Sequence, residues 1–365
     1  SIHDINQAST TNGAFGIYLT GTANNGEISI YNNIIRNITA TNSNNLFSSP
    51  TLSNHGILIA AGATGTNLRL DYNTIAISAA NIAGSNVANP VSCALTISSS
   101  VFTLASLRNN ILQNLNTSSN AMAIYTSGNS NISGALVDNN NYYTPNGNLG
   151  YYNSAIQSNI SNWKTATGKD TRSYNISPNF ISATDLHLNG TVSSLLESGG
   201  TTISGISIDI DGQTRPGPTT VNGGGTAPDI GADEYDGIPA TTVSISGLNA
   251  NPADLCTAGS HVISATITPG SFAISSVVLS YSFNGTSQSP INMTNISGTL
   301  WRATIPIASP TNAIVNWTVT ATDASVTKSL AGTSYQDAAL SGIGLAAYAN
   351  PSPACQGTKT TLSAV

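Results

Sequence analysis

The segment Ile30-Tyr31-Asn32-Asn33-Ile34-Ile35 contains a pattern that the chain repeats: an apolar residue, two mostly polar residues, an asparagine, one further residue, and an apolar or aromatic residue. The other three copies are Leu70-Asp71-Tyr72-Asn73-Thr74-Ile75, Leu107-Arg108-Asn109-Asn110-Ile111-Leu112 and Val137-Asp138-Asn139-Asn140-Asn141-Tyr142. The aligned asparagines, Asn33, Asn73, Asn110 and Asn140, are 40, 37 and 30 residues apart. A repeat of this length is typical of a solenoid built from stacked coils.

A second column of small residues accompanies the asparagines. Counting back 17 residues from each asparagine gives Gly16, Gly56, Cys93 and Ala123, each at the start of a short apolar run. Short runs rich in Ile, Leu and Val and bounded by Gly and Asn favour stacked parallel strands over helices. The segment Ile2-His3-Asp4-Ile5 matches Ile35-Arg36-Asn37-Ile38, so we expect it to end an earlier coil, with at least one coil before Ser1.

The repeated asparagines are expected to be structural. Asparagine tolerates left-handed backbone geometry at a corner, and its amide can bond to its equivalent in the next coil to form a ladder. Beside them, Tyr31, Asp71, Arg108 and Asp138 fall in one column, which we expect on an outward face. A charge ladder that stabilises a solvated strand is one interpretation of this column, and a carbohydrate-contacting strip is the other.

Composition limits the classes of partner. Only 7% of the residues are charged, and 16 acidic against 10 basic residues give a net charge of −6 with no basic cluster. Nucleic acid is therefore not an expected partner, because phosphate-backbone binding needs such a cluster. No apolar run approaches the roughly 18 residues that a membrane span needs, so we expect no membrane-spanning segment. The three cysteines are too sparse for a disulfide scaffold.

The segment after Tyr142 carries a series of motifs. Among them are Trp163-Lys164, Asp185-Leu186-His187-Leu188, Asp211-Gly212 followed by Arg215-Pro216, and Pro228-Asp229-Ile230-Gly231-Ala232-Asp233-Glu234-Tyr235. With the coils, this series resembles the right-handed parallel β-helix (pectin-lyase-like) repeat proteins of Bacteroidetes. The resemblance covers roughly residues 1–237 and implies an extracellular or cell-surface protein, a tail that caps the helix, and export by the type 9 secretion route.

An acidic cluster in this tail offers two interpretations. Asp209, Asp211 and Asp229 could supply carboxylate oxygens to a calcium ion, since hard cations prefer several oxygen ligands around a tight turn. The alternative is an ion pair from Arg215 to one carboxylate, with the other carboxylates capping turns. We expect no other cofactor. The four histidines show no metal-ligand spacing, and a hydrogen-bonded, packed role is expected for His187.

The chain changes character after about residue 237. Alternating apolar and polar runs, such as 277–281, 301–305 and 315–319, predict antiparallel strands of an immunoglobulin-like β-sandwich. The segment Asn251–Cys256 recurs 99 residues later as Asn350–Cys355. The predicted all-β layout is therefore a right-handed parallel β-helix over 1–237 with a truncated N-terminus, a sandwich over 238–340, and the start of a further, truncated module over 341–365.

The functional expectation is a non-enzymatic surface protein: an adhesin, stalk or filament segment whose β-helix face contacts glycans or other cell-surface components. Secretion or anchoring machinery would act on regions outside this segment. The alternative is a carbohydrate-active enzyme, a polysaccharide lyase or hydrolase, with its active site in coils upstream. Such chemistry needs a base near a sugar carbon, often with cationic or metal help. Residues 1–150 offer only four acids and three arginines for it.

Overall fold

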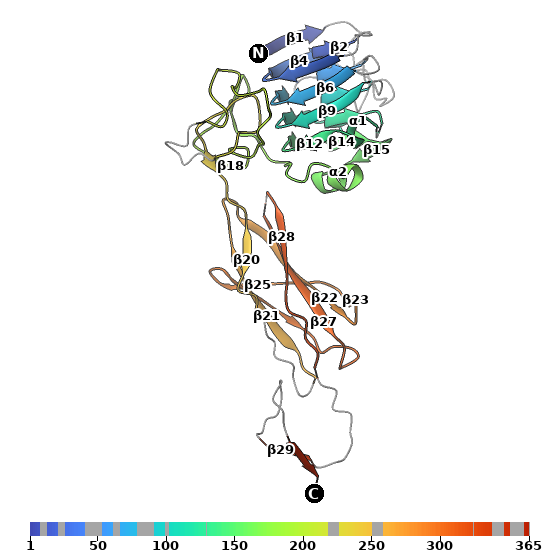
Figure 1. The fold of residues 1–365 in the computed structure, drawn as a ribbon, viewed down its shortest axis with the longest axis vertical. Coiled ribbons are helices and arrows are strands. Elements are labelled where there is room, and N and C mark those ends of the chain that lie inside the picture. The colour runs from blue at the N-terminus through green and yellow to red at the C-terminus, as the bar shows by residue number, and fades with distance from the viewer. Residues whose placement is uncertain are drawn as a thin grey trace. The chain divides into compact units, whose positions relative to one another are not determined.

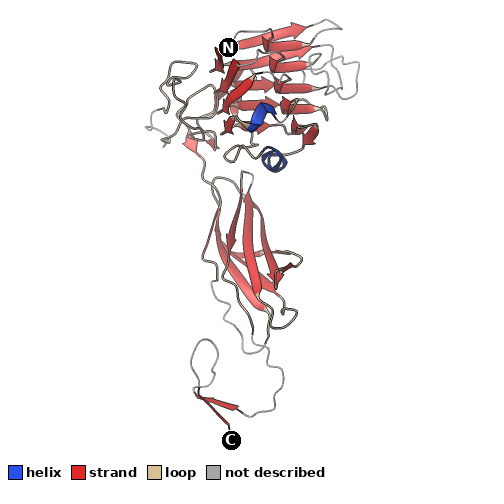
Figure 2. Ribbon diagram, turned by 45° about the vertical axis from the view of Figure 1, so that its right-hand side comes forward, coloured by secondary structure: helices blue, strands red, loops and turns tan. Residues whose placement is uncertain are grey.

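The computed structural model describes residues 1–7, 13–20, 26–40, 53–60, 66–78, 91–98, 102–128, 130–217, 226–249, 258–323, 325–337, 347–350 and 361–364. The chain divides into two compact units, Ser1–Ala240 and Thr241–Val365. Each unit is built from strands, as predicted (Figure 2). No helix among the described residues is long and apolar enough to cross a membrane.

The first unit is a stack of coils, each of which contributes one strand to each of three sheets (Figure 1). The first sheet contains β1 (Ile2–Gln7), β4 (Ile34–Ala40), β7 (Thr74–Ile77), β10 (Ile111–Asn114) and β13 (Asn141–Tyr143). The second contains β2 (Ala14–Leu19), β5 (Asn54–Ile59), β8 (Ser92–Ile97), β11 (Ala121–Thr126), β14 (Asn148–Tyr152) and β15 (Ala155–Gln157). The third contains β3 (Gly26–Tyr31), β6 (Thr66–Asp71), β9 (Thr103–Arg108) and β12 (Leu136–Asp138). All neighbours pair in parallel except β14 and β15.

The interior of the coils is a stack of equivalent apolar side chains. In the first sheet, Ile2 pairs with Ile35, Ile35 with Ile75, Ile75 with Leu112 and Leu112 with Tyr142. The pairing of Ile2 with Ile35 and of Ile5 with Ile38 confirms the match predicted for the first segment. Each fully buried aliphatic side chain of this kind stabilises the fold by roughly 1.5–3 kcal/mol relative to an exposed one.

The small-residue column was correct for three coils and wrong for one. Gly16 is in register with Gly56, and a Cβ on Gly16 would lie 2.5 Å from Ile35 Cγ2 and 2.6 Å from the Gly56 carbonyl oxygen. In the third coil, however, Cys93 pairs with His55, so the residue opposite Gly56 is Ala94. The third coil therefore has one residue fewer between the small residue and its asparagine. Cys93 is buried in a separate cluster with Val91, Met122 and Tyr125.

A short helix closes the end of the coil stack (Figure 2). Helix α2 (Ile160–Thr167) starts at Asn159, whose side chain accepts a hydrogen bond from the Asn162 N–H, and ends at Gly168 with φ of 66°. Its Trp163 is fully buried, with its ring centroid 5.7 Å from that of Tyr142 and 5.9 Å from that of Tyr152. Since the last coil has no neighbour on this side, α2 supplies the apolar cover that a solenoid end requires.

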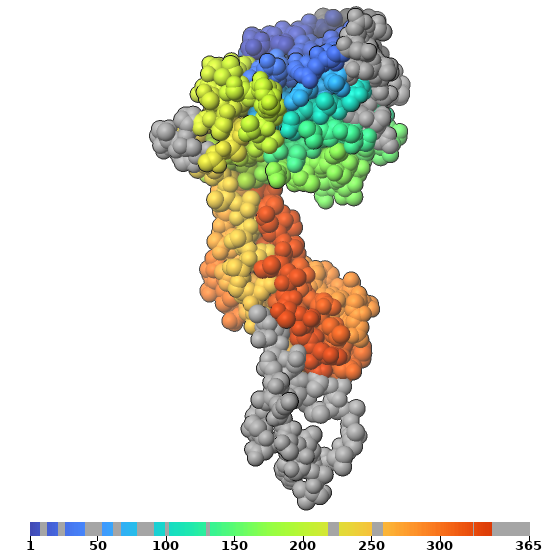
Figure 3. Space-filling model, viewed as in Figure 1, coloured from blue at the N-terminus to red at the C-terminus, as the bar shows by residue number. Residues whose placement is uncertain are grey.

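The rest of the tail does not cap the end. Residues 178–217 and 226–237, which include β16 (Phe180–Ser182), β17 (Asp185–Leu188) and β18 (Ser193–Ser194), lie along the flank of the coils (Figures 1 and 3). Two apolar clusters join the tail to the coils. In one, Leu186 and Ala232 of the tail pack with Ile34 and Ala76 of the coils, and in the other, Ile230 of the tail packs with Ile111. The tail thus closes the end of the coils through α2, as expected, and its later residues also cover one side of several coils, which was not expected. The strand that follows the tail, β19 (Ile238–Pro239), pairs in parallel with β18.

The second unit contains antiparallel sheets around a shared apolar core, consistent with the predicted sandwich. One sheet contains β20 (Ser244–Ser246), β21 (His261–Thr268), β26 (Leu300–Ile305) and β25 (Thr294–Ser297). The other contains β23 (Thr286–Ser287), β22 (Ile274–Phe283), β27 (Val315–Asp323), β28 (Thr327–Ala331) and β24 (Ile291–Asn292). Trp317 is buried in this core and donates its indole N–H to the Thr333 carbonyl oxygen at 2.9 Å.

Further along the chain, β29 (Ala347–Asn350) and β30 (Thr361–Ala364) form an antiparallel pair. The repeated segment 251–256 and all of its second copy except Asn350 lie outside the described residues, including Cys256 and Cys355. The module predicted to start at 341 is described only through these two strands.

Candidate functional site

The four residues predicted to share a column do so. On the third sheet, Tyr31 pairs with Asp71, Asp71 with Arg108 and Arg108 with Asp138. Their environments differ along the column: Tyr31 is 45% exposed, whereas Asp71 is 1% exposed. The column therefore begins at an exposed aromatic ring and passes a buried carboxylate before it reaches Arg108 and Asp138.

Asp71 has structural partners. Its Oδ1 accepts hydrogen bonds from Ser106 Oγ at 2.5 Å and from the Arg108 N–H at 3.2 Å, and Arg69 Nε lies 3.6 Å from Oδ2. Burial raises the pKa of Asp71, and the hydrogen bond from Ser106 and the charge of Arg108 oppose that rise. Asp71 thus ties β6 to β9, which leaves Tyr31, Arg108 and Asp138 as the exposed or half-buried members of the column.

A pocket of about 360 Å³ lies at the Arg108 and Asp138 end of this column. Besides these two residues it is lined by Leu136, by the loop 168–172 that follows α2, and by Thr201 of the tail. Its volume is at the small end of the roughly 300–1,000 Å³ found for ligand sites. We refer to this space, lined by Arg108, Asp138, Lys169 and Arg172, as the cationic pocket.

The carboxylate of Asp138 shapes the pocket. It accepts hydrogen bonds from the Arg172 N–H at 2.7 Å, from the Asn139 N–H at 3.0 Å, and from Thr171 Oγ1 at 3.1 Å. These bonds hold the loop 169–172 against β12. Because protein donors already bind both carboxylate oxygens of Asp138, this side chain positions the loop that carries Lys169 and Arg172.

Lys169 and Arg172 were not among the residues predicted from the sequence. They lie in the loop 168–172, which follows α2 in the tail. A signal was present, because Lys164, Lys169 and Arg172 place three of the chain's ten basic residues within a nine-residue segment.

The predicted asparagine ladder is present. Asn33 Nδ2 donates to Asn73 Oδ1 at 2.9 Å, Asn73 Nδ2 to Asn110 Oδ1 at 3.0 Å, and Asn110 Nδ2 to Asn140 Oδ1 at 3.0 Å. Each acceptor oxygen also binds the backbone N–H of the same preceding asparagine, at 3.3, 2.9 and 3.0 Å. The ladder thus satisfies backbone and side-chain groups at one corner of every coil.

The left-handed backbone predicted at the ladder lies one residue earlier. Asn32, Tyr72, Asn109 and Asn139 have φ between 54° and 58°, whereas no ladder asparagine has positive φ. A left-handed residue turns the chain between the third and first sheets, and the side chain that follows then points into the coil corner. The ladder asparagines are selected for their hydrogen bonds, and the preceding residues for their conformation.

Asp170 ends the ladder. Its Oδ1 accepts from Asn140 Nδ2 at 3.2 Å and from Ser173 Oγ at 2.5 Å, and its Oδ2 accepts from the Trp163 indole N–H at 2.7 Å. The Tyr142 hydroxyl donates to the same carboxylate. Burial raises the pKa of Asp170, while these hydrogen bonds oppose that rise. The carboxylate binds buried groups, and Asp170 is also one of the residues that line the cationic pocket.

The corner residues also hold the tail. Asn32 Nδ2 donates to the Ile208 carbonyl oxygen, and Asn139 Nδ2 to the Gly199 carbonyl oxygen. The Tyr72 hydroxyl and Asn109 Nδ2 both donate to the Thr201 carbonyl oxygen, at 2.8 and 2.7 Å. The left-handed column therefore binds the flanking tail along four successive coils.

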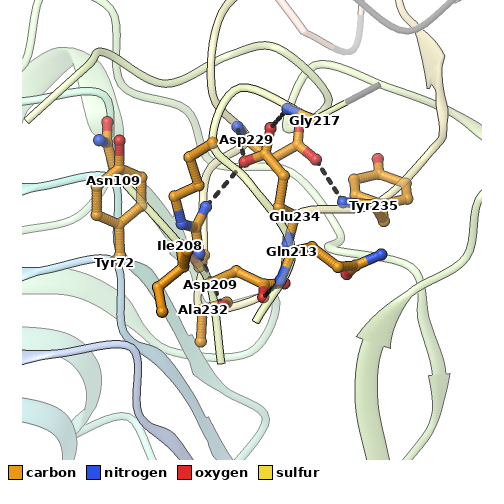
Figure 4. A network of polar contacts seen from close by, with 12 residues as sticks. Tyr72, Asn109, Ile208, Asp209, Gln213, Gly217, Asp229, Ala232, Glu234 and Tyr235 are labelled. Carbon is orange, nitrogen blue, oxygen red and sulfur yellow. Dashed lines mark hydrogen bonds and ion pairs between the residues drawn. The ribbon is translucent and has the colours of Figure 1, made fainter. Parts of the chain in front are cut away.

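Asp209 and Asp229 of the acidic cluster belong, with Glu234, to a buried network of polar contacts (Figure 4), in which Glu234 pairs with Arg215. Arg215 Nη1 donates to Glu234 Oε2 at 2.9 Å, Nη2 donates to the carbonyl oxygens of Gly231 and Ala232, and the guanidinium lies 4.1 Å from the Tyr72 ring centroid. Glu234 also accepts from the N–H groups of Gly217 and Asp229. The predicted alternative, an ion pair from Arg215 to a carboxylate with other carboxylates capping turns, is thus what the structure contains.

The three residues predicted as calcium ligands have separate partners. Asp209 accepts from the N–H groups of Asp211, Gln213 and Glu234. Asp229 accepts from the N–H groups of Ser198 and Tyr235. Asp211 lies 2.9 Å from His187 Nε2. Calcium binding by this trio stays a prediction.

Within the described part of the chain, His187, Asp211 and Asp233 place metal-ligating atoms within 4.8 Å of one another. The other ring nitrogen of His187 lies 2.5 Å from Asp185 Oδ1. Burial opposes protonation of His187, but the hydrogen bonds to Asp185 and Asp211 and the charge of Asp233 together raise its pKa. The contacts of the two ring nitrogens with Asp185 and Asp211 are in line with the hydrogen-bonded role expected for this histidine.

No protein family model and no curated protein sequence matches this chain. The architecture defines the class: a repeat protein of three parallel sheets stacked like a β-helix, followed by antiparallel sheets.

Proposed function

We propose that this chain is part of a non-enzymatic, secreted or cell-surface repeat protein whose β-helix contacts glycans through the third sheet. The observation that carries the proposal is the in-register column from Tyr31 to Asp138, which ends at a pocket of about 360 Å³. A parallel sheet with the exposed aromatic ring of Tyr31 and a polar pocket offers the stacking surface and the hydrogen-bond donors that sugars use.

Two further features support an extracellular setting. Low charge and abundant Asn, Ser and Thr are unlike most cytoplasmic enzymes. The Asp211-Gly212, Arg215-Pro216 and 228–235 motifs also resemble the tail of the Bacteroidetes β-helix proteins, and this tail forms the buried Arg215 network. We therefore propose that the chain belongs to that group and is exported by the type 9 route, as a segment of an adhesin, stalk or filament.

The charged side chains of the column argue for binding over chemistry. Asp71 and Asp138 are the two acids of the column that runs from Tyr31 to Asp138. Both already accept hydrogen bonds that hold neighbouring strands or loops in place. A general base must be free to accept a proton from the substrate. The roles of these two carboxylates fit a scaffold for a ligand.

A polysaccharide panel tests the proposal. The chain is incubated with immobilised plant, algal and animal polysaccharides, and both retention on the matrix and released products are measured. The proposal expects retention without unsaturated or reducing-end products. Retention lost on Tyr31→Ala or Arg172→Gln would assign it to the third sheet, whereas product release would overturn the non-enzymatic assignment.

A further inference from the structure

The basic residues of the β-helix unit divide into two groups. Arg36 lies 3.7 Å from Asp4, Arg69 lies 3.6 Å from Asp71, and Arg215 lies 2.9 Å from Glu234. These cations each have a carboxylate partner. The basic residues around the cationic pocket form no such pair among the described residues.

The side chains of Arg108 and Lys169 donate hydrogen bonds to uncharged groups. Arg108 Nε donates to Ser106 Oγ at 2.8 Å, and Lys169 Nζ donates to the Ala135 carbonyl oxygen at 2.9 Å. A guanidinium has five N–H donors and an ammonium has three, so both retain donors for a ligand. Arg172 uses its backbone N–H to hold Asp138, and its side chain is exposed.

The pocket therefore has an excess of positive charge in a chain of net charge −6. Two acids are among its lining residues: the carboxylate of Asp138 already accepts three hydrogen bonds, and the carboxylate of Asp170 accepts hydrogen bonds from Trp163 and Tyr142. Lys164 adds a further cation beside the loop, since its Nζ donates to the Thr171 carbonyl oxygen at 3.2 Å.

We infer that the cationic pocket binds the carboxylate or sulfate group of an acidic polysaccharide. This inference rests on the proposed glycan contact and specifies its ligand class. Arginine recognises such planar or tetrahedral anions through paired N–H donors. The pocket is larger than a single small anion needs, and the exposed Leu136 and the hydroxyl-bearing Thr201 on its wall suit the apolar face and the hydroxyl groups of a sugar ring.

The test compares polygalacturonate with its fully methyl-esterified form, because esterification removes the charge and keeps the sugar backbone. Chondroitin sulfate, polyglutamate and inorganic sulfate are the further probes. The chain is expected to bind polygalacturonate or chondroitin sulfate, to lose at least about tenfold in affinity for the ester, and to bind more weakly as salt rises.

Matched variants localise the effect. Arg108→Gln with Arg172→Gln is expected to weaken acidic-polysaccharide binding about tenfold or more, as the loss of two charge-assisted contacts predicts. Arg302→Gln with Lys328→Gln removes the same charge from the second unit and is expected to leave binding unchanged. Arg172→Gln alone keeps the backbone bond to Asp138, so it provides the test if the double variant fails to fold.

The outcomes separate this inference from the proposed function. Equal binding of the charged polymer and its ester, unaffected by the arginine changes, would leave the glycan contact standing and overturn the anionic ligand. Equal binding of polyglutamate, or full competition by millimolar sulfate, would overturn the polysaccharide assignment in favour of a general anion site. Absence of binding to every polysaccharide would overturn both proposals.

Discussion

At the residue scale, one asparagine per coil organises the β-helix. The amide of each ladder residue links its coil to the next, and its oxygen also accepts a hydrogen bond from a backbone N–H. The ladder therefore supplies hydrogen-bond partners to buried polar groups that would otherwise lack them. The repetition of this residue in the sequence reflects that requirement. Ligand binding does not explain it.

The ladder predicts a graded effect of substitution. Asn110→Ala removes the acceptor of two Asn73 donors and the donor to the Leu70 and Arg108 carbonyl oxygens, so we expect a loss of about 2–4 kcal/mol in the free energy of unfolding. Asn33→Ala, at the partly exposed end of the ladder, should cost about 1 kcal/mol or less. Urea-dependent pulse proteolysis measures both. Equal losses at the two positions would contradict a cooperative ladder.

The small-residue column gives a second prediction. Gly56→Ala places a Cβ against Ile75 Cγ2 and 2.6 Å from the Ala94 carbonyl oxygen, so overpacking should destabilise the unit by about 1–3 kcal/mol. Gly134→Ala is the control, because its Cβ would meet no atom within 4 Å. Thermal unfolding compares the two variants. A Gly56→Ala protein as stable as the control would show that the coils can shift to admit the methyl group.

At the element scale, the tail is attached through buried charge. Arg215→Met leaves Glu234 without its cation, and we expect a loss of about 3–5 kcal/mol, since an unpaired buried charge is costly. Adding Glu234→Gln should restore part of that loss. Hydrogen exchange at residues 229–235 reports tail detachment directly. If the double variant loses as much as the sum of the single variants, the two side chains do not act as a pair.

The same tail makes stability depend on pH. Burial, together with the charges of Glu234 and Glu197, raises the pKa of Asp229 to about 9, and burial also raises the pKa of Asp233 and Glu234. Between about pH 4 and pH 9 the folded state therefore binds more protons than the unfolded state, and the free energy of unfolding falls as pH rises, by up to about 1.4 kcal/mol per pH unit for each proton. His187, with its raised pKa, acts in the same direction.

Urea unfolding of the β-helix unit at pH 5 and pH 8 checks this dependence. We expect a lower midpoint at pH 8, and a smaller difference between the two midpoints in an Asp229→Asn variant. A midpoint that is equal or higher at pH 8 would mean that the buried carboxylates of the tail are ionised without penalty.

At the scale of the whole molecule, repetition determined how much could be predicted. The aligned copies around Asn33 and Asn73 predicted the parallel sheets, the ladder and the outer column, because identical positions in successive coils must stack. The prediction placed Cys93 in the small-residue column, where the structure has Ala94. The error arose because the prediction assumed a spacing of 17 residues from the small residue to its asparagine in every coil, and the third coil has one residue fewer.

The tail could be predicted less well than the coils. Its motifs indicated a defined structure and the Arg215 ion pair, but they do not repeat, so no column fixed where the tail lies. Its position along the flank depends on contacts such as Asn109 with Thr201, which are 92 residues apart in the chain. The cationic pocket depends on the same long-range packing, which is why Lys169 and Arg172 were absent from the predicted site.

Hydrogen-exchange footprinting of the chain with and without polygalacturonate tests most directly whether the third sheet of the β-helix is the glycan-contacting surface. We expect slowed exchange on polysaccharide binding at β9, β12 and the loop 168–172, with the antiparallel unit unchanged. Protection confined to residues 241–337, or no protection anywhere in the presence of bound polysaccharide, would contradict the proposal that the third sheet contacts glycans.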